Sequence, residues 1–170
     1  TGISKLGENQ VFYLPYLMGE RSPHNDPDAR AMFLGMSMNT MRQDMTQAVL
    51  EGVAFGLRDS LEVARSQGIE VQCSKICGGG AKSPLWQKII ANVMNLTLEI
   101  PKNEEGPGLG AAMLAAVGCG EYASAAEACE KLVKTKAVIA PDPVLVEKYE
   151  ERYQKFKKLY PAVKGVLGES

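Results

Sequence analysis

Apolar residues recur at three- and four-residue intervals in the first half of the chain. The run lies between a capping-box pattern at Thr40 and Gln43 and a terminal glycine at Gly68, which together predict an amphipathic helix. Gly52 and Gly56 lie inside this helix, and each lowers helix stability by about 1 kcal/mol relative to Ala. We therefore expect another segment of backbone to approach it closely. The members of the apolar stripe are Met45, Val49, Val53, Leu57, Leu61 and Ala64.

Three later helices are predicted by caps and by spacing. Ser83 and Pro84 favour a helix start, and Asn95 is typical of a left-handed terminator. A segment at 108–117 is dominated by Ala and Gly, so we expect it to pack closely against a neighbour. A helix also starts at the capping box of Ser124 and Glu127.

The last predicted helix begins at Asp142 and Pro143. Its inner stripe is aromatic, formed by Tyr149, Tyr153, Phe156 and Tyr160.

Residues 11–17, 71–77 and 97–100 are rich in branched and aromatic residues and predict strands. Strands and helices therefore alternate, which indicates an α/β layer architecture with helices packed on a sheet. Three strands make a thin sheet, so we expect further strands of this domain before Thr1.

Composition narrows the class of protein. A chain of 170 residues is long enough for one domain, and its net charge of -1 does not favour a nucleic-acid partner. The sequence has no run of about 18 apolar residues that would span a membrane, and no signal-peptide pattern. The four cysteines show no C-x-x-C pair, so we expect reduced, mostly buried thiols and a cytoplasmic protein; they are Cys73, Cys77, Cys119 and Cys129.

A glycine-rich turn between a predicted strand and a predicted helix is the strongest candidate for chemistry. Glycines allow positive φ and close contact with a ligand, and a helix start favours anions. The pattern is neither the dinucleotide fingerprint nor the P-loop, and a turn that serves only packing is an equally open interpretation. We define the glycine turn as residues 78–83: Gly78, Gly79, Gly80, Ala81, Lys82 and Ser83.

Other candidates are less specific. The small residues at 106–112 could admit a ligand or serve close helix packing, and the polar loop at 19–27 could be functional or simply solvated. His24 in that loop lacks the second histidine or cysteine that a metal site needs. Adjacent carboxylates occur at 104–105 and 150–151, and such pairs usually face solvent.

Together these segments resemble the C-terminal domain of the FGGY family of carbohydrate kinases. A family signature of small, apolar and glycine residues fits residues 31–36, and its acidic helix start with a short apolar run fits 44–51, ending at Glu51. The glycine turn is similar to the family's adenosine motif, and residues 109–112 are similar to the start of its last core helix. Within the family, residues 14–25 are most similar to xylulose kinases.

The resemblance implies an actin-like ATPase fold, related to ribonuclease H, of which residues 1–170 would form part of the C-terminal domain. It implies ATP and Mg²⁺ as cofactors, D-xylulose as the sugar, and the glycine turn as the nucleotide contact. The general-base aspartate and the sugar-binding N-terminal domain are expected upstream of Thr1, so no catalytic residue or metal ligand is assigned here. Glu20 and Arg21 are expected to shape the cleft, Lys82 to face solvent, and Glu51 to be structural.

Three alternatives stay open. One is a sister kinase of the family that acts on gluconate, glycerol, ribulose or another sugar. Another is an actin-like binding domain without transferase activity. Homodimerisation is also left open, because the sequence does not determine the oligomeric state.

Overall fold

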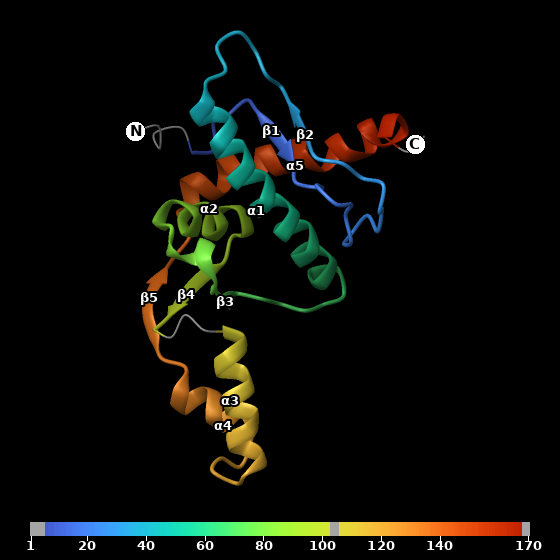
Figure 1. Cartoon of the computed structure of the whole chain (residues 1–170). Helices are drawn as coiled ribbons and strands as arrows, with labels where there is room; N and C mark the ends of the chain where they lie inside the picture. Colours follow the sequence, from blue (N-terminus) through green and yellow to red (C-terminus); the bar gives the residue numbers. More distant parts are fainter. Residues whose placement is uncertain (1–5, 103–105, 168–170) are drawn as a thin grey trace.

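The computed structural model describes residues 6–102 and 106–167, which excludes the carboxylate pair at 104–105. Two small sheets and five α-helices make up this part of the chain (Figure 1). Strand β1 (Phe12–Leu14) pairs antiparallel with β2 (Met32–Leu34). Strand β4 (Thr97–Pro101) lies between β3 (Cys73–Lys75), to which it is parallel, and β5 (Thr135–Ile139), to which it is antiparallel.

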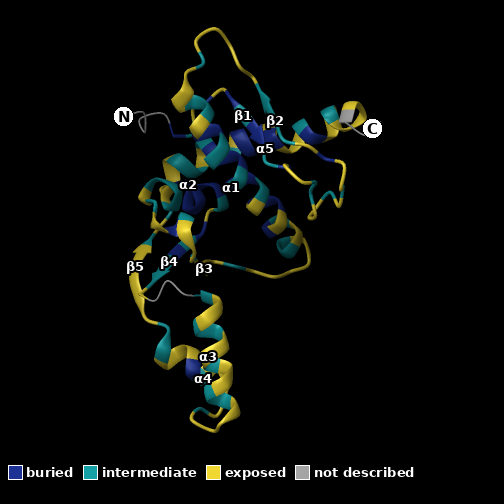
Figure 2. Ribbon diagram, viewed as in Figure 1, coloured by how far each residue is buried: buried dark blue, intermediate teal, exposed yellow. Residues whose placement is uncertain are grey.

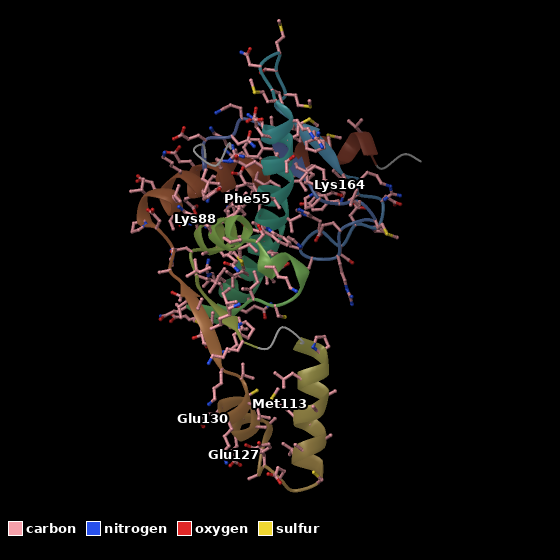
Figure 3. All side chains as sticks on the ribbon, turned by 60° about the vertical axis from the view of Figure 1, so that its left-hand side comes forward. Phe55, Lys88, Met113, Glu127, Glu130 and Lys164 are labelled. Atoms are coloured by element: carbon pink, nitrogen blue, oxygen red, sulfur yellow. The ribbon has the colours of Figure 1, made fainter. Side chains whose placement is uncertain are left out.

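The helices are α1 (Arg42–Ser66), α2 (Pro84–Met94), α3 (Gly106–Gly118), α4 (Ala125–Leu132) and α5 (Pro143–Leu167), and a short 3₁₀ helix, η2 (Gly79–Lys82), precedes α2. Helices α1, α2 and α5 enclose the main core. The aromatic stripe predicted for the last helix is confirmed, since all four of its rings are buried. Phe55 of α1 stacks on Tyr153 with the ring centroids 6.0 Å apart, in the middle of this body (Figure 3).

Most helix ends follow the predicted caps. Ser83 Oγ accepts from the N–H of Trp86 at 3.4 Å, Asn95 is left-handed with φ 49°, and Asp142 Oδ1 accepts from the N–H of Val144 at 2.9 Å. Gly68 follows α1 with φ +81°. Ser124 caps α4 as predicted, accepting from the N–H of Glu127 at 3.2 Å.

The capping box predicted at Thr40 is wrong by one residue. The first residue of the box is Met41, whose N–H donates to the Asp44 carboxylate at 2.9 Å. Thr40 Oγ1 instead accepts from the N–H of Ser37 at 2.8 Å, which closes the turn before the helix. The Asp44 carboxylate therefore stabilises the helix start that Gln43 was expected to stabilise.

The strand prediction missed two strands and assigned the strands it found to one sheet instead of two. β2 and β5 were missed, and β1 belongs to a separate two-stranded sheet instead of the sheet of β3 and β4. β2 is three residues long, and β5 is exposed except at Ile139. Neither has the apolar alternation by which a strand is recognised in a sequence.

Helices α3 and α4 form a hairpin that extends beyond the sheet (Figure 2). The close packing expected for 108–117 is wrong, because α3 has no buried residue. The expectation of mostly buried thiols is also wrong. All four cysteines are free, as expected, but all are exposed, two of them on this hairpin and two at β3 and the turn after it.

The close approach expected at Gly52 is confirmed. A Cβ at Gly52 would overlap the carbonyl oxygen of Tyr13 in β1, whereas a Cβ at Gly56 would lie an ordinary 3.6 Å from Pro15. We predict that Gly52→Ala lowers the free energy of unfolding by about 1–3 kcal/mol through overpacking. Gly56→Ala is the matched control, and its better helix propensity should leave stability equal or raised by up to about 1 kcal/mol. Urea denaturation of both variants checks this, and equal effects would contradict it.

Candidate nucleotide site

The candidate site lies where the parallel strands β3 and β4 end. Ligands of open α/β sheets bind in the crevice beyond the carboxyl ends of the strands. A cavity of about 290 Å³ occupies this position. It is bounded by the end of β3, the glycine turn, the start of α2, the end of β4, and β5, and its lining residues are Ile76, Cys77, Gly78, Ala81, Lys82, Gln87, Ile100, Pro101, Lys136 and Ala137.

The glycine turn is built by the local sequence. Gly78 has φ +91°, a left-handed conformation that favours glycine, and it redirects the chain from β3 into η2. The N–H of Ala81 donates to Gly78 O and the N–H of Ser83 donates to Gly80 O, both at 3.1 Å. These N–H groups are thus satisfied within the turn, and the Ser83 side chain caps α2.

Gly79 and Gly80 have different surroundings. Among the described residues, no heavy atom beyond the chain neighbours lies within 4 Å of the Cβ position at Gly78 or at Gly79. This open space is what a ligand pressed against the backbone would need. A Cβ at Gly80 would instead overlap the ring of Trp86, so Gly80 is required for packing. The packing interpretation therefore holds for Gly80, whereas Gly78 and Gly79 have space for a ligand.

Of the six residues predicted at the site, Gly78, Ala81 and Lys82 line the cavity. Ala81 is buried, and Lys82 is exposed as expected. Gly79, Gly80 and Ser83 belong to the same turn but are not among the described lining residues. All six remain together in one local structure, as the spacing required.

Two polar lining residues were missed by sequence reasoning. Gln87 lies one helical turn after Ser83, and its side-chain amide donates to the carbonyl oxygen of Ala81, which fixes the turn on α2. Its position four residues after the cap was the available signal. Lys136 comes from β5, whose strand was not predicted, so no sequence signal placed it near the glycine turn.

The polar loop at 19–27 forms a different structure. The Glu20 carboxylate accepts from the N–H groups of Ser22 and His24, each at 2.7 Å. The His24 ring packs on Tyr160 of α5 with the ring centroids 4.4 Å apart, and Tyr160 donates to Asp26 at 2.5 Å. Neither Glu20 nor Arg21 is among the described residues that line the cavity beyond β3 and β4.

The structural role expected for Glu51 is confirmed. Glu51 is 1% exposed, and its carboxylate accepts from Arg152 at 2.8 Å, Gln47 at 2.8 Å and Tyr149 at 3.0 Å. Arg152 also donates to Val11 O at 3.2 Å. Glu51 therefore joins α1 to α5 and, through Arg152, to the segment before β1.

Across residues 6–102 and 106–167, no group of three or more His, Cys, Asp or Glu side chains is arranged to hold a metal ion. No helix in those same ranges is both long and apolar enough to cross a bilayer. Among its described lining residues, the cavity has no Asp or Glu side chain that could hold Mg²⁺.

Comparison with known proteins decides the family. The family model described as "FGGY family of carbohydrate kinases, C-terminal domain" matches residues 4–119. The chain belongs to the FGGY family of carbohydrate kinases. The xylulose kinase of Staphylococcus epidermidis is 37% identical over 166 residues, which are 98% of this chain and 34% of that relative. The chain thus spans about a third of the length of the curated relatives that it matches.

Solved structures agree with this membership. The ligand-bound xylulose kinase of Lactobacillus acidophilus is 26% identical with a TM-score of 0.88, over 96% of this chain and 33% of that one. The glycerol kinase of Plasmodium falciparum, solved with ADP, is 28% identical with a TM-score of 0.76, over 95% of this chain and 32% of that one. The expected actin-like ATPase fold is confirmed.

Proposed function

We propose that this chain forms the nucleotide-binding side of a kinase that transfers the γ-phosphoryl group of ATP to a hydroxyl of D-xylulose. One observation carries the proposal: the cavity beyond β3 and β4 is bounded by the glycine turn that resembles the family's adenosine motif. The names of the relatives support the sugar, since the S. epidermidis relative is a xylulose kinase. The glycerol kinase structure with ADP supports the nucleotide.

The residues present suggest which steps of the reaction this chain supports and which steps the rest of the protein supports. Bound ATP supplies the phosphoryl group, and Mg²⁺ neutralises the charge on its phosphates. Gly78 and Gly79 leave space for the nucleotide against the backbone, and Gln87 holds the turn in place. The general base and the sugar site are assigned to the N-terminal domain of the longer protein. Residues 1–170 are proposed as part of its C-terminal domain.

A second acceptor is favoured by one specific observation. The glycerol kinase of P. falciparum matches this chain with a TM-score of 0.76, so the nucleotide side of the fold also occurs in a kinase with a different named acceptor. Residues that choose the acceptor would lie on the sugar side. The alternative function is therefore phosphorylation of glycerol by the same nucleotide site.

The test is a panel of acceptors offered to the full-length protein with ATP and Mg²⁺. We expect the highest kcat/KM with D-xylulose, measured by ADP release, and no turnover by the isolated 170-residue chain. The second expectation follows because transfer needs an in-line hydroxyl and a base, which the proposal places outside this chain. A higher kcat/KM for another acceptor would show that the substrate is that acceptor instead of D-xylulose. Turnover by the isolated chain would refute the assignment of the general base and the sugar site to the N-terminal domain.

A further inference from the structure

Helix α3 is apolar on every side. Its 13 residues are Gly, Pro, Ala, Leu, Met and Val only, so the helix has no charged or hydrogen-bonding side chain. A helix that is apolar all round is normally buried in a protein core or in a membrane. None of the α3 residues is buried, however, and Leu114 is 66% exposed. The sequence of α3 is therefore that of a buried helix, whereas its surroundings leave it open.

Helix α4 covers only one side of α3. Leu109, Met113, Ala116 and Val117 lie on one face of α3 and are half-buried. Figure 3 shows Met113 on the side nearer α4, which is the principal neighbour of α3. We call the remaining exposed residues the open face of α3: Pro107, Gly108, Ala111, Ala112, Leu114, Ala115 and Gly118. They are small or apolar, so another segment of protein could approach them closely.

The start of α3 lies beside an open sheet edge. A Cβ at Gly106 would lie 3.1 Å from the Sγ of Cys77, which follows β3 closely in the chain. β3 is an edge strand, paired among the described strands only with β4, and all of its residues are exposed. An edge strand presents unpaired backbone N–H and C=O groups that can accept another strand. A partner that pairs with β3 would thus lie next to α3.

The chemistry of α3 does not suit a membrane. A membrane-spanning helix needs about 20 residues, and α3 has 13. A helix that lies in the membrane interface needs a charged face as well as an apolar one, and α3 has no charged residue. The open face therefore suits an apolar protein surface, which would belong either to a second copy of this chain or to the rest of a longer protein.

The relatives favour the longer protein. This chain spans about a third of the length of the curated xylulose kinases that it matches, so the larger part of such a protein lies outside residues 1–170. The family model of the C-terminal domain matches residues 4–119, which include all of α3. The helix is thus part of the domain that the family shares. We propose that the open face of α3 packs, in the full-length protein, against an apolar surface of the part that precedes residues 1–170.

This inference rests on the proposed function only in taking the chain as part of a longer kinase, and it requires neither bound ATP nor a sugar. The test is the rate at which iodoacetamide alkylates a cysteine introduced into the full-length protein, located by mass spectrometry. Ala112→Cys and Leu114→Cys each place a thiol on the open face, and Ala112→Cys changes the size of the side chain little. Ala126→Cys on α4 is the matched control, because Ala126 is exposed. Each rate is divided by the rate for the same cysteine in the urea-unfolded protein, which removes differences in intrinsic reactivity.

We expect the normalised rates of Ala112→Cys and Leu114→Cys to be at least about tenfold below that of Ala126→Cys, because a covered thiol reacts only after local opening. The rates should not depend on protein concentration, since the partner belongs to the same polypeptide. Rates within about twofold of the control would overturn the inference by showing an exposed face. Protection that disappears on dilution would overturn it too, because the partner would then be a second copy.

The proposed function is tested separately, by turnover of the acceptor panel. An exposed open face in a protein that phosphorylates D-xylulose would overturn this inference and leave the proposed function standing. A protected open face in a protein that phosphorylates no acceptor would refute the proposed function and support this inference.

Discussion

Replacing Glu51 with Ala is expected to lower the free energy of unfolding by about 3–5 kcal/mol, because the change leaves the buried Arg152 cation without its partner. Arg152 is 6% exposed and its guanidinium packs over the ring of Phe12. The Gln47 and Tyr149 donors lose their acceptor in the same variant. Urea denaturation followed by circular dichroism measures the loss.

Two controls separate the buried charge from simple loss of contact. The double variant Glu51→Leu with Arg152→Met removes both charges, and it should recover most of the stability lost in Glu51→Ala, since apolar residues can replace a buried ion pair. Lys131→Ala breaks the exposed pair with Glu127, whose atoms lie 2.7 Å apart, and should change stability by less than about 1 kcal/mol. A double variant no more stable than Glu51→Ala would show that the unpaired buried charge is not the cause of the loss.

Replacing Gly79 with Val is expected to raise the apparent KM for ATP about tenfold while leaving the melting temperature within a few degrees of the wild type. The reason is that no described residue beyond its chain neighbours lies within 4 Å of the Cβ position at Gly79, so the new side chain would occupy space that the proposal gives to the nucleotide. Overpacking at the contact with the ligand should cost about 1–3 kcal/mol of binding free energy, which is enough for this change. Steady-state kinetics of the full-length protein and thermal denaturation measure both quantities.

Gly80→Ala is the matched comparison at the next position. Its Cβ would overlap Trp86, so it should destabilise the fold, and any change in ATP affinity would follow from distortion of the turn. The sugar KM should remain unchanged in Gly79→Val. An unchanged ATP KM in Gly79→Val, or an equal rise in the KM for the sugar, would count against contact between the turn and the nucleotide.

The predictable parts of the fold are those with strong local signals. Ser83, Asn95 and Asp142 mark helix ends by chemistry that acts within a few residues, and the aromatic stripe of α5 is visible as a period of three and four. β5 has no such signal, because four of its five residues are exposed and its position depends on pairing with β4. The exposure of the cysteines likewise depends on the course of the chain in space, which a general tendency of thiols to be buried does not report.

Only the part of the candidate site formed by the glycine turn could be predicted from the sequence. The turn at 78–83 is contiguous in sequence, so its glycines, the helix cap and the family resemblance all point to it. Lys136 is more than fifty positions away and reaches the cavity only through the sheet. The different surroundings of Gly79 and Gly80 also could not be read from the sequence, since they depend on where the ring of Trp86 lies.

Nuclear magnetic resonance can show where ADP binds on this chain. Backbone amide shifts of the ¹⁵N-labelled protein would be followed during titration with ADP. We expect the largest shifts on residues 78–83 and on β5, and we expect Gly79→Val to reduce them. Saturable shifts confined to another surface, such as the loop at 19–27, or no shifts at any concentration, would contradict it.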